Sequence, residues 1–199
     1  MTVRDLIPTN VCESYLLRLQ RVLCESDWSN VSRLAAVVRD CWLAGRQVML
    51  CGNGGSAGNA MHIANDLVYG VAKGRGPGVR ALALSANPAV VTCLGNDLGY
   101  EHIYAAQIAV HGQPGDLLIA LSGSGNSPNI VRAVEQARQM GIKTCAVLGY
   151  SGGKVKALVD LPIHFAIDDM QISEDLQLIV AHMTTQWLQR HSRADEEAA

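Results

Sequence analysis

Two stretches of this chain share one design, and that design limits the folds open to it. Each is an apolar run that ends in a turn of glycine and serine and then takes on helical spacing: QVMLCGNGGSAGNA at residues 47–60, and GDLLIALSGSGNSPNI at residues 115–130. Apolar residues without alternation are typical of a strand buried on both faces. A strand, a glycine turn and a helix in this order predict an α/β fold with a parallel sheet.

Further segments continue the alternation of strand and helix. Apolar runs at residues 79–85, 143–149 and 161–167 predict three more strands, and helical spacing recurs at residues 128–141 and from about residue 172 to 190. Residues 9–45 contain two amphipathic helices separated by SDWSN. We therefore expect a three-layer sandwich, flavodoxin-like or Rossmann-like, with a mostly parallel five-stranded sheet preceded by two helices. No linker divides the chain, which predicts a single domain over residues 1–192 and a disordered tail at residues 193–199.

Charge and composition argue against several classes of partner. The formal net charge is −2 and lysine and arginine form no run, so the basic stripe that attracts nucleic acid or an anionic membrane is missing. No apolar run approaches the roughly 20 residues that span a bilayer, and the first residues lack the apolar stretch of a signal peptide. We expect a cytoplasmic protein with no nucleic-acid or membrane partner. The cysteines lack C-x-x-C spacing, which predicts reduced core thiols with no catalytic role: Cys12, Cys24, Cys41, Cys51, Cys93 and Cys145.

The two turns are predicted to meet at one edge of the sheet and to bind an anion. In a parallel sheet the ligand lies beyond the carboxyl ends of the strands, where turns lead into helix N-termini. Glycine lets the backbone approach a ligand, and free N–H groups, the helix dipole and serine hydroxyls all favour a phosphate. The predicted binding residues are Asn53, Gly54, Gly55 and Ser56 in the first turn, and Ser122, Gly123, Ser124, Asn126 and Ser127 in the second.

Two nucleotide sites compete with this interpretation. Gly52, Gly54 and Ala57 satisfy a relaxed dinucleotide fingerprint, but that site needs an acidic residue at the end of the next strand, and RALALSANP at residues 80–88 has none. A phosphate loop of nucleotide triphosphatases needs Gly-Lys-Ser/Thr, which neither turn contains. A small phosphorylated metabolite, such as a sugar phosphate, fits better.

Four motifs, in order and spacing, resemble those of the sugar isomerase (SIS) family, and within it the phosphoheptose isomerases: CGNGGSAGNAMHIANDL, CLGNDLGYE, LSGSGNSPNIVRAVEQAR and EDLQLIVAHM. The resemblance implies interconversion of sedoheptulose 7-phosphate and an aldoheptose 7-phosphate. It also implies a homotetramer with active sites at subunit interfaces. A phosphosugar-binding regulator or protein-interaction module without catalysis is the alternative, because one fold hosts several functions.

The resemblance also implies roles for residues of the substrate site. Ser122, Ser124 and Ser127 would hold the phosphate, with Gly123 where the family usually has threonine. Asn53, Ser56 and Asp97 would contact the sugar hydroxyls.

Catalytic and metal-binding residues follow from the same resemblance. Asp66 and His182 would move protons, and His62, Asp66, Glu174 and His182 would hold zinc. Asp66 stands where the family has glutamate, Glu174 where it has an amide, and Gln171 where it has aspartate.

Spacing alone supports one part of this set and questions another. His62 and Asp66 share a helix face. Glu174 and His182 are eight residues apart, or about 12 Å along a regular helix. They can share an ion only if Glu174 precedes the helix or a second subunit contributes. The remaining histidines are expected to be structural or surface residues: His102, His111, His164 and His191.

Overall fold

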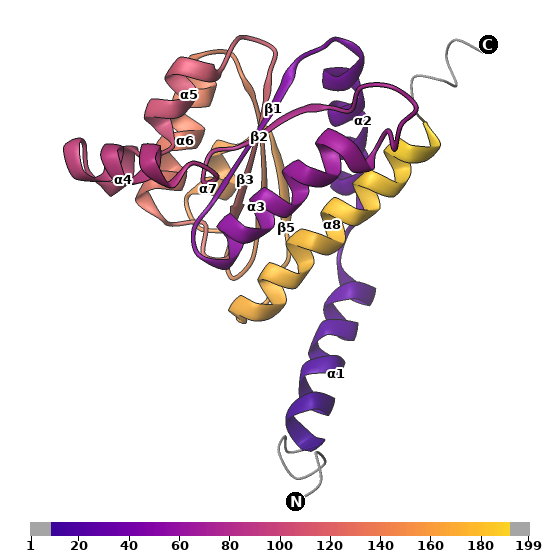
Figure 1. Ribbon diagram of the computed structural model, residues 1–199. Coiled ribbons are helices and arrows are strands. Elements are labelled where there is room, and N and C mark those ends of the chain that lie inside the picture. The colour runs from indigo at the N-terminus through magenta and orange to yellow at the C-terminus, as the bar shows by residue number, and fades with distance from the viewer. Residues whose placement is uncertain (1–8, 192–199) are drawn as a thin grey trace, which may run out of the picture.

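A parallel sheet of five strands runs through the middle of the molecule (Figure 1). The computed structural model describes residues 9–191, so the predicted tail at residues 193–199 lies outside the described residues. The strands are β1 (Gln47–Gly52), β2 (Arg80–Ala83), β3 (Leu117–Ser122), β4 (Lys143–Leu148) and β5 (Leu161–His164). Their order is β2-β1-β3-β4-β5, and each neighbouring pair is parallel. This is the flavodoxin-like order, and it confirms the predicted sheet.

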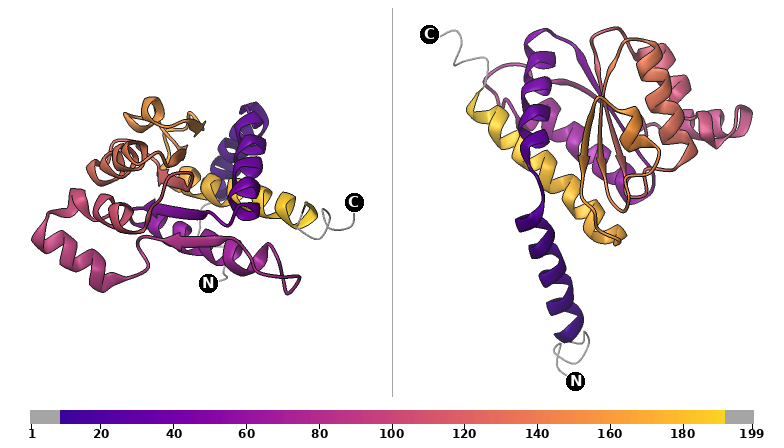
Figure 2. Two further views of the ribbon diagram at one scale, coloured as in Figure 1. Left: turned by 90° about the horizontal axis from the view of Figure 1, so that it is seen from above. Right: turned by 180° about the vertical axis from the view of Figure 1, so that it is seen from behind.

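Helices cover both faces of the sheet, as predicted (Figures 1 and 2). On one face lie α2 (Ser29–Leu43), α3 (Gly55–Asn65) and α8 (Met170–Arg190). On the other lie α5 (Ala105–His111) and α6 (Pro128–Gln139), with α4 (Pro88–Asp97), a short 3-10 helix η3 (Tyr100–His102) and α7 (Val155–Leu158) nearby. A π-helical turn, η2 (Asp66–Gly70), continues α3.

The sheet separates two apolar cores. Along β3, Leu117, Ile119 and Leu121 pack into the core under α2, α3 and α8, whereas Leu118 and Ala120 pack into the core under α5 and α6. Because successive strand side chains point to opposite faces, a strand between two helical layers must be apolar throughout. This explains the uninterrupted apolar runs of the sequence.

Helix α1 (Thr9–Glu25) extends away from the sheet, and much of its apolar surface is uncovered (Figure 2). Val11, Leu16 and Leu17 are each more than half exposed. Two polar contacts join this helix to the first turns of α8. The Tyr15 hydroxyl donates to the Asp175 carboxylate, and the Arg18 guanidinium pairs with Asp169.

Asp169 begins α8 and sets its first turn. Its Oδ1 accepts a hydrogen bond from the Ile172 N–H at 3.0 Å, so α8 starts at Met170, slightly before the predicted residue 172. That hydrogen bond, together with the Arg18 guanidinium, holds the pKa of Asp169 below its usual range.

Asp169→Ala should therefore lower the free energy of unfolding by about 1 kcal/mol at pH 7, since the helix loses its cap. Folding lowers this pKa, so the stabilisation is present above the unfolded value of about 4 and is lost as the pH falls through the folded value. Urea unfolding of both proteins should show a difference that shrinks below about pH 4. Asp169→Asn, which keeps a capping oxygen, should lose less stability, and a difference unchanged with pH would contradict the assignment.

The cysteine prediction is half right. All six thiols are free, but only Cys41, Cys51 and Cys145 are buried, whereas Cys12, Cys24 and Cys93 are exposed. The exposed three lie on α1 and α4, whose apolar sequences suggested burial that a single chain does not provide. Within residues 9–191, helices of the length and apolarity needed to cross a membrane are absent.

Candidate active site

The two glycine and serine turns lie side by side at the carboxyl edge of the sheet. They follow β1 and β3, which are neighbours with Gly52 opposite Leu121. From β1 the chain turns outward to β2, and it later returns on the other side as β3, which makes this pair the switch point of the sheet. Ligands of open parallel sheets bind at such a point. The predicted meeting of the two turns is confirmed.

A pocket lies between the turns and the start of α8. The predicted residues Asn53, Ser56, Ser122, Gly123, Ser124 and Ser127 line it, together with Leu121, Met170 and Glu174. Gly54 and Gly55 carry the first turn into α3, and Gly54 has φ +55°, a left-handed conformation that glycine adopts without strain. Six of the substrate residues predicted in the two turns therefore line one hollow, whereas Gly54, Gly55 and Asn126 of the turns, and Asp97 of α4, do not.

Asn126 and Asp97 point their polar groups elsewhere in the single chain. The side-chain oxygen of Asn126, Oδ1, accepts a hydrogen bond from the Lys154 N–H at 3.1 Å. Asp97 is exposed at the end of α4, where its carboxylate accepts from the Asn96 amide at 2.8 Å. Contact of either residue with a substrate stays a prediction.

Gly123 owes its lack of a side chain to Met170. A Cβ atom at residue 123 would lie 2.6 Å from the Met170 sulfur, closer than real contacts allow. Met170 therefore occupies the space that a threonine side chain would need. The departure at Gly123 is a local exchange in which an apolar side chain from α8 replaces a hydroxyl from the turn.

Two buried side chains that sequence reasoning missed hold the turns in place. Asn129 and Asn53 exchange amide hydrogen bonds of 2.7 and 2.9 Å, which join the second turn to the first. Gln177 of α8 donates to the Ser56 hydroxyl at 2.9 Å. Asn129 and Gln177 are nearly fully buried. Each is far in sequence from the residue it bonds to, so no local sequence pattern predicts these contacts.

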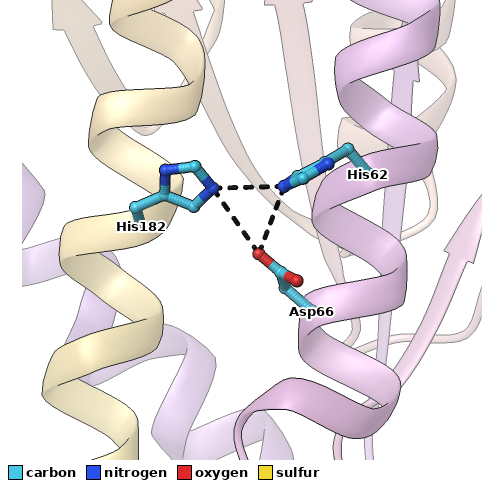
Figure 3. Close-up of side chains that lie close together, drawn as sticks. All are labelled: His62, Asp66 and His182. Carbon is cyan, nitrogen blue, oxygen red and sulfur yellow. Dashed lines mark hydrogen bonds and ion pairs between the residues drawn. The ribbon is translucent and has the colours of Figure 1, made fainter.

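His62, Asp66 and His182 form a second cluster, further along the same two helices (Figure 3). The Nε2 atoms of the two histidines are 3.1 Å apart, and Asp66 Oδ2 lies 3.5 Å from His62 Nε2 and 3.7 Å from His182 Nε2. His62 is in α3, and Asp66 opens the π-helical turn that follows, in which the Val71 N–H bonds to the Asp66 carbonyl oxygen. Such turns are frequent at functional sites. About half of each histidine side chain is exposed, so the cluster is accessible.

The geometry of this cluster fits a zinc ion. Zinc bonds of about 2.0–2.2 Å in a tetrahedral site place the ligand atoms roughly 3.4 Å apart, and the three observed separations bracket that value. Two imidazole nitrogens that face each other at 3.1 Å need a shared proton or a cation between them. The three side chains are therefore suitable metal ligands.

Glu174 does not join the cluster within one chain. It lies inside α8, two turns before His182. Its carboxylate stands 2.3 Å from where a Cβ of Gly55 would be, at the pocket between the two turns. The four-residue ligand set thus reduces in a single chain to three residues whose ligand atoms lie within 4.8 Å of one another. The physical reason is that Glu174 lies in the regular helix α8, eight residues before His182, which separates the two by about 12 Å along the axis.

Comparison with known proteins places the chain in a family. The SIS domain family matches residues 13–149. The chain is 39% identical over 161 residues to a phosphoheptose isomerase of Akkermansia muciniphila, covering 81% of this chain and 85% of that relative. It is also 39% identical over 153 residues to a phosphoheptose isomerase of Rhodospirillum rubrum, covering 77% and 81%.

Solved structures agree with the sequence relatives. A phosphoheptose isomerase from Francisella tularensis superposes with a TM-score of 0.86 at 27% identity, covering 96% of this chain and all of that one. The phosphoheptose isomerase of Neisseria gonorrhoeae gives a TM-score of 0.82 at 25% identity, covering 94% and 98%. The chain therefore belongs to the SIS-domain family and, within it, to the phosphoheptose isomerases.

Proposed function

We propose that this protein interconverts sedoheptulose 7-phosphate and an aldoheptose 7-phosphate. The names of its relatives support this activity, and so does the distance between the two groups of site residues. Helices α3 and α8 both begin at the pocket between the turns and lie side by side, each carrying one histidine of the cluster (Figure 1). A substrate that binds both groups must therefore be elongated along these helices.

The length of a seven-carbon sugar phosphate matches this separation, and this match carries the proposal. His62 is six residues after Ser56, or about 9 Å along α3, and His182 is eight residues after Glu174, or about 12 Å along α8. Eight single bonds join the phosphorus to C1 of the sugar, and such a chain spans roughly 9 Å when extended. The phosphate can thus bind the turn at residues 122–127, which we call the serine turn, while the carbonyl end reaches the histidine cluster.

At the phosphate end, serine hydroxyls are prepared to donate. Ser122 Oγ accepts from the Gly125 N–H at 3.1 Å, and Ser124 Oγ accepts from the Asn126 N–H at 3.2 Å. Because each oxygen already accepts from the backbone, its own hydrogen is free to point at a phosphate oxygen. The start of α6 at Pro128 adds the positive end of a helix dipole.

At the carbonyl end, the reaction is the transfer of a proton between C1 and C2. A base removes a proton from C1 of the ketose while the C2 carbonyl oxygen gains one, which gives an enediol; C2 then gains a proton as the C1 hydroxyl loses its own. We assign proton removal to Asp66, through Oδ1, the oxygen that lies outside the three-atom cluster. His182 stands next to it and serves the substrate oxygens.

We propose that zinc is held by His62, Asp66 and His182. When bound, the ion would polarise the carbonyl group. One nitrogen cannot bind a metal and a proton at the same time, so with the ion bound His182 Nε2 would be a ligand that positions the ion, and not itself a proton donor. Glu174 would join the ion only from another subunit.

Exposed apolar side chains support assembly into a homotetramer with active sites at subunit interfaces. Three lie on α1, and others flank the histidine cluster: Met61, Val68, Tyr69 and Met183. Monomers seldom expose such patches without a partner. Light scattering tests the assembly by its mass relative to the 21.3 kDa chain. A cytoplasmic location stays a prediction.

The double variant Ser124→Ala and Ser127→Ala should raise the KM for sedoheptulose 7-phosphate by about thirtyfold to a thousandfold, with kcat nearly unchanged, because the two lost hydrogen bonds to a charged group cost about 1 to 2 kcal/mol each. Formation of the aldose measures both constants. Ser32→Ala, at an exposed serine of α2 outside the pocket lining, is the control. A fall in kcat at constant KM would place the phosphate elsewhere.

A further inference from the structure

A loop after β4 fixes the shape of the serine turn. We call residues 149–155 the strap. The Gly149 N–H donates to the Gly123 carbonyl oxygen at 2.9 Å, and the Val155 N–H donates to the Gly125 carbonyl oxygen at 3.1 Å. The Lys154 N–H bonds to the Asn126 side chain. The N–H groups of the strap therefore bond to oxygen atoms of the serine turn. These oxygens then point away from a ligand such as phosphate, which needs N–H donors.

The strap and the serine turn meet through the backbones of glycine residues. A Cβ at Gly125 would lie 2.0 Å from the Gly152 carbonyl oxygen, and a Cβ at Gly153 would lie 2.5 Å from Gly125. Within the strap, Tyr150 has φ +45°, a left-handed conformation that is costly for a residue with a side chain. A strained segment keeps such a conformation only when its surroundings hold it there.

His164, the last residue of β5, contributes to that hold, together with the Tyr150 N–H, which donates to the Ile167 carbonyl oxygen at 2.9 Å. Its Nε2 lies 2.9 Å from the Tyr150 carbonyl oxygen, and its Nδ1 lies 3.1 Å from the Lys156 ammonium. A carbonyl oxygen only accepts and an ammonium only donates, so the ring must be neutral, with its proton on Nε2. The ring also lies under the strap, where a Cβ at Gly152 would meet its Cδ2 at 3.2 Å.

We propose that His164 is a positioning residue for phosphate binding, acting through the strap on the serine turn. The inference rests on the proposed function, since it places the phosphate at that turn. His164 touches neither the lining of the pocket nor the histidine cluster. Its loss should let the strap relax, which releases the carbonyl groups of Gly123 and Gly125 and disorders the N–H groups that a phosphate would meet.

His164→Leu tests this role through the balance of kinetic constants. The KM for sedoheptulose 7-phosphate and the Kd for inorganic phosphate should both rise about tenfold, the equivalent of about one lost hydrogen bond, while kcat stays within about twofold. His164→Gln, whose amide nitrogen can reach the same carbonyl, should restore most of the affinity. Tyr150→Gly in the His164→Leu background should also restore part of it, because glycine accepts positive φ without strain.

Hydrogen exchange separates this inference from the proposed activity. In His164→Leu the amides of residues 122–127 should exchange faster, and in His164→Gln they should not. His111→Leu, an exposed histidine at the opposite edge of the sheet, should change neither exchange nor affinity. If His164→Leu does not fold, Lys156→Met gives the same comparison, with a smaller rise in Kd.

The outcomes distinguish the two proposals. Absence of turnover by the unaltered protein would overturn the isomerase activity, yet the exchange rates and the phosphate affinity would still report on the strap. Unchanged exchange and affinity in His164→Leu would overturn the positioning role. So would a loss of kcat at unchanged KM.

Discussion

The His182→Ala variant should lose about a thousandfold in kcat for the isomerisation of sedoheptulose 7-phosphate. The substitution removes the only imidazole that α8 brings to the cluster and leaves His62 and Asp66 without their partner. The phosphate pocket lies about 12 Å away along the helix, so affinity for the sugar phosphate should stay within about threefold of the parent value. Nuclear magnetic resonance of the aldose product measures the rate, and calorimetry measures the affinity.

His191→Ala is the matched control, since it removes a second imidazole from the end of α8. That ring stacks on Trp187 with centroids 4.2 Å apart and lies outside the cluster. The control should keep near-normal kcat. Comparable losses in both variants would indicate damage to α8 rather than loss of a catalytic group. Clear sugar-phosphate binding without turnover in the unaltered protein would favour the regulator that the sequence left as the alternative.

Removal of metal should abolish turnover and lower the melting temperature, and added zinc should restore both. A ligand that binds only the folded state stabilises it by RT ln(1 + [L]/Kd), which is about 4 kcal/mol at a thousandfold excess over Kd. Metal analysis of the dialysed protein should find one zinc per chain, and Asp66→Ala should find almost none. Full activity and an unchanged melting temperature after chelation would show that the cluster works without a metal.

Glu174→Ala separates two origins of the fourth ligand. Glu174 lies beside Gly55 and outside the three-residue cluster of its own chain. If the ion is held by one chain alone, this variant should bind zinc as tightly as the parent. Weaker binding would show that Glu174 of a neighbouring subunit completes the site, and mixing it with His62→Ala subunits would then rescue part of the binding.

Much of this arrangement could be predicted because it depends on residues that are close together in the sequence. Uninterrupted apolar runs identify the strands, and the glycine and serine that follow β1 and β3 identify the turns. A parallel sheet then leaves little freedom in where those turns go, so the pocket followed from topology. His62 and Asp66 are adjacent on a helix face for the same local reason.

Contacts between distant segments could not be predicted. The amide pair of Asn53 and Asn129 and the bond from Gln177 to Ser56 depend on how helices meet, and each residue alone looks like an ordinary polar residue. His164 was expected to be merely structural or on the surface, although it bonds to the strained Tyr150. The place of Glu174 beside Gly55 depends on how α8 packs against α3, which the sequence of either helix does not reveal.

The proposed phosphate site and the proposed reactive end belong to different parts of the fold. Both turns end central strands of one sheet, whose hydrogen bonds fix their spacing at about 4.8 Å. The histidine cluster sits on helices joined by side-chain packing and a few side-chain hydrogen bonds, such as those from Asn59 to α8, and such contacts tolerate shifts and substitutions more readily than strand pairing does. The fold therefore combines a rigid site suited to phosphorylated compounds with a neighbouring surface that can change. Related proteins can acquire new chemistry on that surface while the rigid site stays the same.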